Sequence, residues 1–221
     1  MKAIRTLAAA LAVVTLVPAV GMAQTARPFQ NSWFWGIKGG GTFVSSPSKS
    51  NVTSGMAGID WLITRQRGGL YVSLDQSFLS QYAVLADSVN STDTPSRVNL
   101  KNMRRLTVAI MGYPGDWVRF HPYAGLGMTY STVGQITPQT AYTSQDQYTL
   151  AQQIIAQYKS VFSPTLLLGA QFQVRNAAVF VQGMGWQANQ NFFLSSSTHG
   201  FNASIEAGLR YNFGSSVEQD R

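Results

Sequence analysis

Six charged residues alternate with apolar neighbours along segments that are otherwise polar on one side and apolar on the other. Three are basic and three are acidic: Lys38, Asp60, Asp75, Arg105, Glu206 and Arg210. A charge removed from water is costly unless an opposite charge accompanies it. The pattern therefore predicts a balanced network of ion pairs, with Lys38 paired to Glu206. Such a network would either fill a closed interior or act as a gate whose pairs rearrange to pass small solutes.

Residue types that supply catalytic nucleophiles or metal ligands are scarce. The chain has no cysteine, and its only histidines, His121 and His199, lie far apart in the sequence. Neither histidine begins a His-x-Ser arrangement, and no Gly-x-Ser-x-Gly motif is present. We therefore expect no catalytic residue, no cofactor and no metal site.

The first 23 residues differ from the rest of the chain. Lys2 and Arg5 precede an apolar run from Leu7 to Val17, and small residues follow up to Ala23. This order is typical of a signal peptide that is removed on export, with an uncleaved anchor as the alternative. Removal of 1–23 leaves 14 basic and 9 acidic residues, a net charge of +5 instead of +7. This mild excess gives little reason to expect a nucleic-acid partner.

The clearest alternation of apolar and polar residues runs from Phe201 to Phe213. Every second residue there is apolar, and those between are polar or glycine. This period of two predicts a strand between two environments, and about 9–11 residues are enough to cross a bilayer at a tilt. Similar segments occur at 35–43, 57–64, 70–75, 105–110, 123–130, 166–174 and 178–187. The facing of 178–187 stays open, because Val179 and Val181 compete with Phe180 and Met184 for the apolar side.

Long and short connections alternate between these segments. They span 45–54, 65–69, 79–97, 114–121, 131–163, 175–177 and 188–199. Outer-membrane barrels join short periplasmic turns to longer external loops. We therefore predict an all-β, eight-stranded antiparallel up-and-down transmembrane β-barrel at 33–213, after a periplasmic segment at 24–32 and before a polar tail at 214–221. The alternative is a soluble, lipocalin-like barrel, which the scarcity of charges on the polar faces disfavours.

Aromatic residues near the predicted strand ends suggest two interfacial girdles. Those expected at the periplasmic level are Trp33, Trp35, Tyr113, Trp117, Tyr123, Tyr211 and Phe213. Those expected at the outer level are Phe43, Phe78, Tyr130, Trp186 and Phe201.

The chain resembles the small OmpA/OmpX-type outer-membrane barrels. The segments that carry this resemblance are Trp35-Gly36-Ile37-Lys38-Gly39-Gly40, Pro122-Tyr123-Ala124-Gly125-Leu126-Gly127 and Gly208-Leu209-Arg210-Tyr211-Asn212-Phe213. The resemblance implies a place in the outer membrane of a Gram-negative-type bacterium. It also implies that Gly208, Leu209, Tyr211 and Phe213 form a signal for the barrel assembly machinery. In the family this signal usually ends the chain, whereas here Gly214 to Arg221 follow.

Two features predict contacts at the outer surface. Arg97, Lys101 and Arg104 could meet lipopolysaccharide phosphates through charge-assisted hydrogen bonds, or be ordinary solvated charges. In the third external loop, apolar residues recur at helical spacing: Tyr148, Ala151, Ile155, Tyr158 and Phe162, with Leu150, Ile154 and Val161 beside them. We expect an amphipathic helix that either covers the barrel mouth or contacts a surface ligand, lipid or host partner.

Three functions fit this sequence. The first is a barrel with a structural or surface-interaction role that presents loops to the exterior. The second is a small passive pore or gated channel for small solutes. The third is a lipid-modifying barrel enzyme, for which no motif is present.

Overall fold

The computed structural model describes residues 28–44, 52–85, 96–115, 118–138, 145–187 and 201–216. The described elements are β1 (Ser32–Val44), β2 (Val52–Arg65), β3 (Gly68–Leu85), β4 (Ser96–Gly112), β5 (Phe120–Pro138), α2 (Gln145–Tyr158), β6 (Ser160–Val174), β7 (Ala177–Gln187) and β8 (Phe201–Ser215). The predicted signal peptide at 1–23, Trp117 and residues 217–221 of the predicted tail lie outside the described residues.

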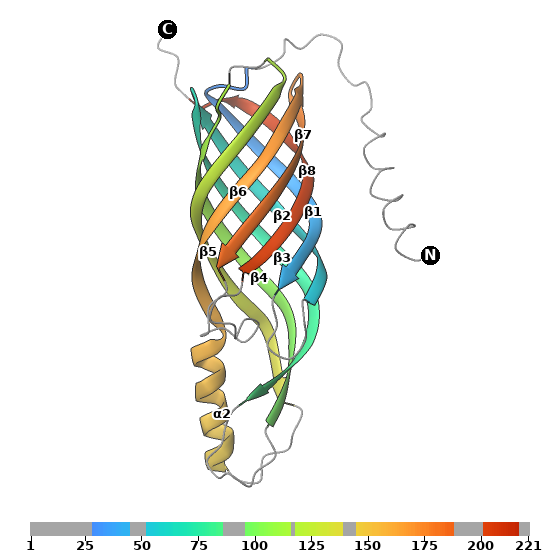
Figure 1. Ribbon diagram of the computed structural model, residues 1–221, viewed down its shortest axis with the longest axis vertical. Helices are drawn as coiled ribbons and strands as arrows, with labels where there is room; N and C mark the ends of the chain where they lie inside the picture. Colours follow the sequence, from blue (N-terminus) through green and yellow to red (C-terminus); the bar gives the residue numbers. More distant parts are fainter. Residues whose placement is uncertain are drawn as a thin grey trace, which may run out of the picture.

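The strands form a closed barrel in sequence order, with antiparallel pairing between neighbours and between β8 and β1. This confirms the predicted eight-stranded up-and-down topology. The connections between β2 and β3, β4 and β5, and β6 and β7 lie at one end of the barrel, which we call the turn end (Figure 1). The opposite end, where α2 lies, is the loop end.

The barrel has an apolar outer surface and a polar interior. Ile110, Leu126 and Ile37 are 74%, 70% and 65% exposed on the outside. In contrast, Arg105 and Glu206 are almost completely buried inside. Water would not favour this inverted arrangement, whereas the hydrocarbon of a bilayer does. The strands therefore span a membrane, and the soluble, lipocalin-like alternative is wrong.

Among the described residues, no helix is both long enough and apolar enough to cross a membrane.

Three strands extend farther at the loop end than the sequence predicts. β3 continues to Leu85, β4 begins at Ser96 and β5 ends at Pro138, so parts of the predicted loops 79–97 and 131–163 are strand. The extensions are stabilised by backbone pairing and by inward apolar side chains. These side chains include Leu79, Val98, Leu100 and Val133, which belong to the buried hydrophobic cluster.

The structure settles the facing of β7. Val179 and Val181 face outward, whereas Phe180, Met184 and Trp186 face inward and are buried. The predicted place of Trp186 in the outer girdle is therefore wrong. Tyr113 and Tyr123, expected in the periplasmic girdle, also face the interior. These corrections share a cause, because the interior contains cations and polar groups that aromatic faces and phenol groups can contact.

Candidate functional site: the ion-pair network in the barrel interior

The structure brings the six predicted charges together at mid-height in the barrel. Each projects from an inward-facing strand position and is at most 5% exposed: Lys38 (β1), Asp60 (β2), Asp75 (β3), Arg105 (β4), and Glu206 and Arg210 (β8).

Four of these charges form a closed ring of alternating sign. The Lys38 Nζ lies 2.8 Å from Asp75 Oδ1 and 2.7 Å from Glu206 Oε2. The Arg105 Nη2 lies 3.2 Å from Glu206 Oε1 and 3.5 Å from Asp75 Oδ2. Each cation therefore contacts both carboxylates, and the predicted pairing of Lys38 with Glu206 is present.

The other two charges form a bidentate pair nearer the turn end. Arg210 donates from Nε to Asp60 Oδ1 at 3.0 Å and from Nη2 to Asp60 Oδ2 at 3.1 Å. Gln182 connects the region of this pair with the ring, because its Nε2 donates to Glu206 Oε2 at 2.8 Å while its Oε1 accepts from Tyr123. Parallel bonds to a carboxylate fix a guanidinium more firmly than one bond does.

Inward glycines allow two of these ion pairs to reach across an intervening strand. Gly36 on β1 lies between Asp60 on β2 and Arg210 on β8. A Cβ at Gly36 would lie 2.5 Å from Asp60 Oδ1 and 2.8 Å from Arg210 Cγ. Gly58 on β2 similarly pairs with Lys38 on one side and Asp75 on the other, and a Cβ there would overlap the Asp75 carboxylate.

Aromatic faces cover the two guanidinium groups. The Arg210 guanidinium lies 3.7 Å from the centroid of Phe180, and that of Arg105 lies 4.4 Å from the centroid of Trp186. Such contacts stabilise a cation without adding a negative charge. Among the described residues, Arg105 Nε and Nη1 have no hydrogen-bond partner, so Arg105 is the least satisfied member of the network.

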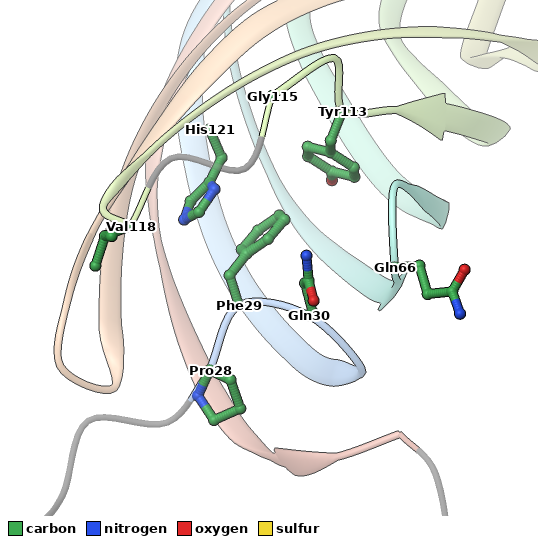
Figure 2. A pocket seen from close by; sticks show the side chains of 8 residues that line it. All are labelled: Pro28, Phe29, Gln30, Gln66, Tyr113, Gly115, Val118 and His121. Atoms are coloured by element: carbon green, nitrogen blue, oxygen red, sulfur yellow. The ribbon is translucent and has the colours of Figure 1, made fainter.

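The residues just before β1 close the interior at the turn end, a feature that the sequence prediction missed. Figure 2 shows Phe29 between His121 and Tyr113. Its ring stacks on His121 with centroids 3.8 Å apart and meets Tyr113 edge-on at 4.8 Å. Asn212 Nδ2 donates to Pro28 O at 3.1 Å, which fixes the segment to β8. The alternation in β1 begins after Phe29, so no periodic signal marked this plug.

A cavity of about 270 Å³ lies beside this plug (Figure 2). Its lining includes Phe29, Tyr113, Val118 and His121. The His121 Nε2 has no hydrogen-bond partner among the described residues, and burial raises the pKa of Tyr113, which keeps its phenol neutral.

The predicted lipopolysaccharide contacts lie on β4 at the loop end. Lys101 and Arg104 are both exposed, although they are three positions apart in the strand. They share the outer face because β4 is irregular at Asn102, whose φ is 58°, opposite the register shift between Ser77 and Ser80 of β3. Arg97 pairs with Val84 in the extended part of β3 and β4, and its side chain lies outside the described residues.

The helix expected in the third external loop is present as α2. Ala151 and Ile155 are buried and belong to the hydrophobic cluster of the strand extensions. Phe162, which was predicted to extend the helical pattern, instead lies in β6, where its ring contacts Tyr130 with centroids 4.7 Å apart. The helix ends earlier because residues from Ser160 pair with β5.

The residues of the predicted assembly signal lie on β8 near the turn end. Tyr211 and Phe213 face outward, with ring centroids 5.1 Å apart. Leu209 shares this outer face, whereas Gly208 faces inward against the ring of Phe180. Their positions place an aromatic pair at the membrane boundary.

The described residues hold no group of three or more His, Cys, Asp or Glu side chains that could bind a metal ion. What the network does is hold three positive and three negative charges in a compact arrangement across the interior. Its groups can fix neighbouring strands and exclude free solute, or exchange partners within the four-membered ring.

Comparison with known proteins gives matches of structure. No protein-family model and no curated protein matches the sequence. Neisserial surface protein A has 10% sequence identity and a TM-score of 0.52, with 82% of this chain and 97% of that chain covered. The protein Ail of Yersinia pestis has 11% identity and a TM-score of 0.49, with 84% and 100% covered. OprG of Pseudomonas aeruginosa has 12% identity and a TM-score of 0.48, with 84% and 98% covered.

At these identities the likeness concerns the fold alone. The match to Neisserial surface protein A agrees with the closed eight-stranded topology and with the membrane-facing outer surface described above. The chain therefore has the fold of the small eight-stranded outer-membrane barrels.

Proposed function

We propose that this chain is a closed outer-membrane barrel with a structural role that presents an extended surface outside the cell. In this proposal a Gram-negative-type bacterium exports it with a cleaved signal peptide, and the turn end faces the periplasm. The observation that carries the proposal is the ring of Lys38, Asp75, Arg105 and Glu206, whose balanced charges lie across the interior. A filled interior of this kind favours a stable closed barrel over an open pore.

The external surface is where we propose interactions. The extensions of β3, β4 and β5, together with α2, form a platform at the loop end (Figure 1), and its buried apolar side chains belong to the same hydrophobic cluster as those of the barrel interior. In this proposal Lys101 and Arg104, with Arg97 on the same strand, would contact lipopolysaccharide phosphates. The third external loop, which contains α2, would carry the contact with a surface ligand.

We also propose that β8 carries the signal by which the barrel assembly machinery recognises the chain. The outward aromatic pair of Tyr211 and Phe213, with Leu209 beside it, supports this proposal. The signal lies within a paired strand, so it would be read before β8 closes against β1.

A gated channel is the second candidate. The observation that favours it is the incomplete satisfaction of Arg105, whose Nε and Nη1 have no partner among the described residues. Each cation of the ring contacts two carboxylates, so a pair can break without leaving either cation alone. Rearrangement of such pairs is one way to open a narrow passage.

Two measurements test the proposal. In gel electrophoresis of the membrane fraction, the unheated barrel should migrate differently from the heated chain, because a closed barrel resists detergent until it is heated. The purified protein should give no stable conductance steps in a planar bilayer. A band in the soluble fraction that heating does not shift would contradict the membrane location. Stable steps from the wild type would favour the channel.

A further inference from the structure

The turn end of the barrel carries four exposed arginines. They are Arg65 at the end of β2, Arg67 in the β2–β3 turn, Arg119 before β5, and Arg175 in the β6–β7 turn. The carboxylates of the described residues lie elsewhere: Asp60, Asp75 and Glu206 in the interior, and Asp146 on α2 at the loop end. Within the described ranges, this end of the barrel therefore has a net positive charge. We call these four residues the arginine rim.

The arginine rim is distributed around the barrel. Its members belong to three successive connections, and the closed strand order separates these connections along the circumference (Figure 1). Cations that bind one small ligand converge on a point. Cations spread around a barrel instead face the molecules that surround it.

Backbone hydrogen bonds fix the connections that carry the rim. The Arg67 carbonyl accepts from Tyr113 N, and the Arg119 carbonyl accepts from Gln173 N, each at 2.8 Å. The Arg175 carbonyl accepts from Gln173 Nε2, also at 2.8 Å. The Asn176 carbonyl, next to Arg175, accepts from Asn212 N of β8 at 2.7 Å. Because each connection is bonded to a neighbouring element, the starting points of the arginine side chains are held in place.

The rim lies where the apolar belt ends. Arg65 follows Trp61 on the same outward face of β2, and Trp61 packs against Trp33 and Trp35 with ring centroids 5.2 Å and 5.7 Å apart. Arg119 directly precedes Phe120, which is 47% exposed on the outer surface. Aromatic side chains mark the interfacial level of a membrane, and arginines beside them reach the headgroups.

We propose that the arginine rim binds the phosphate groups of anionic phospholipids in the periplasmic leaflet. A guanidinium forms paired, charge-assisted hydrogen bonds with phosphate oxygens. The radial spread of the rim matches a shell of lipids, whereas a peptidoglycan strand would meet only one side of it. The periplasmic leaflet follows from the proposed function, in which the turn end faces the periplasm, and binding there is independent of the lipopolysaccharide contact at the loop end.

Tryptophan fluorescence can test this binding, because Trp33, Trp35 and Trp61 form an outward cluster on the same face of the barrel as Arg65, toward the turn end. The barrel is reconstituted in vesicles with brominated phosphatidylglycerol or brominated phosphatidylcholine, and quenching gives the relative binding constant of the two lipids. We expect a preference for phosphatidylglycerol of at least about fivefold, since each surface cation contributes that order of attraction. Both leaflets have the same composition, so the orientation of the barrel does not matter.

The variant R65Q/R67Q/R119Q/R175Q should lose most of this preference. The control Lys159→Gln removes an exposed cation just after α2, outside both proposed lipid contacts, and should keep it. Heat-modifiable mobility shows that each variant is folded. If the quadruple rim variant does not fold, the single variants R65Q and R119Q should each show a weaker preference for phosphatidylglycerol. The preference of the wild type should also weaken in about 1 M salt, where screening of surface charges is nearly complete.

Four results would overturn the proposal. One is a wild type that binds both lipids equally, and another is a rim variant that keeps the full preference. The third is binding to purified peptidoglycan sacculi that the rim variant loses while its lipid preference is unchanged, which would assign the rim to the cell wall. The fourth is competition by inorganic phosphate at 10 mM, on the order of the dissociation constant of a weak phosphate site. We expect this concentration to leave the lipid preference unchanged, because a lipid-specific site does not bind free phosphate.

Discussion

Gly36 shows how the absence of a side chain permits an ion pair. The bidentate pair of Asp60 and Arg210 joins β2 to β8 across β1, and Gly36 is the β1 residue between them. A Cβ there would lie 2.5 Å from Asp60 Oδ1 and 2.9 Å from Leu209 O. We expect Gly36→Ala to lower the free energy of unfolding by about 1–3 kcal/mol, the usual range for overpacking. Urea-induced unfolding from lipid vesicles measures this change.

Gly55 provides the matched control for Gly36. It lies on β2 with an outward facing, and a Cβ at this position would meet nothing within 4 Å. Gly55→Ala should leave the stability unchanged or raise it by a few tenths to about 1 kcal/mol, since it removes freedom from the unfolded chain. Equal losses from Gly36→Ala and Gly55→Ala would show that the ion pair does not depend on the space at Gly36.

The positions of the interior charges could be predicted from the sequence, but their partners only in part. Period two fixes the facing of each residue, so Lys38 and Arg105 could be assigned to the interior. The pair of Asp60 and Arg210 crosses an intervening strand, which alternation within each segment does not reveal. Trp186 was misplaced because alternation separates polar from apolar residues, whereas an aromatic ring over a buried cation belongs inside.

At the scale of elements, the irregularity between β3 and β4 determines which charges the barrel presents outside. Strict alternation would place Lys101 and Arg104 on opposite faces. The positive φ of Asn102, opposite the register shift between Ser77 and Ser80, gives them a common outer face, and Asn tolerates a positive φ better than most residues. Such an irregularity has no periodic signature, so the sequence predicted the residues of this cationic surface without the geometry that aligns them.

The cationic surface of β4 predicts a measurable loss of lipopolysaccharide binding. We expect K101Q/R104Q to weaken the affinity of the folded barrel for lipopolysaccharide by roughly tenfold or more, since each lost charge-assisted bond contributes on the order of 1 kcal/mol. Surface-bound lipopolysaccharide and the detergent-solubilised barrel suit this measurement. The control is Lys159→Gln, which removes an exposed cation just after α2. An equal loss in both variants would indicate general attraction between charges.

At the scale of the whole molecule, the barrel topology follows from two patterns that agree. Alternation of apolar and polar residues predicted the strands, and alternation of long and short connections predicted their up-and-down order. Neither pattern predicted the lengths of β3, β4 and β5 or the plug at Phe29. Strand extensions depend on backbone partners and on contacts with α2, and the plug depends on side chains from distant turns such as Tyr113. Neither is encoded in a local period.

The ion-pair ring, the plug at Phe29 and the buried ring of Trp186 each block the interior. Loss of one of them should therefore lower the stability of the barrel without opening a conducting path. Lys38→Ala leaves the carboxylates of Asp75 and Glu206 with one cation of the ring, which we expect to lower the free energy of unfolding by about 3–5 kcal/mol. Phe29 still covers the turn end and Trp186 remains buried beyond the ring. Planar bilayers should therefore show no new conductance steps from this variant.

Phe29→Ala is the complementary variant, because it opens the plug while the ion-pair ring stays intact. It too should remain without conductance, and its loss of stability should follow from the lost aromatic contacts, at about 3–5 kcal/mol for a large buried ring. Conductance steps from Lys38→Ala alone would mean that the ring is the gate, and they would favour the channel over the closed barrel. If Lys38→Ala changed neither stability nor conductance, the network would have no part in either function.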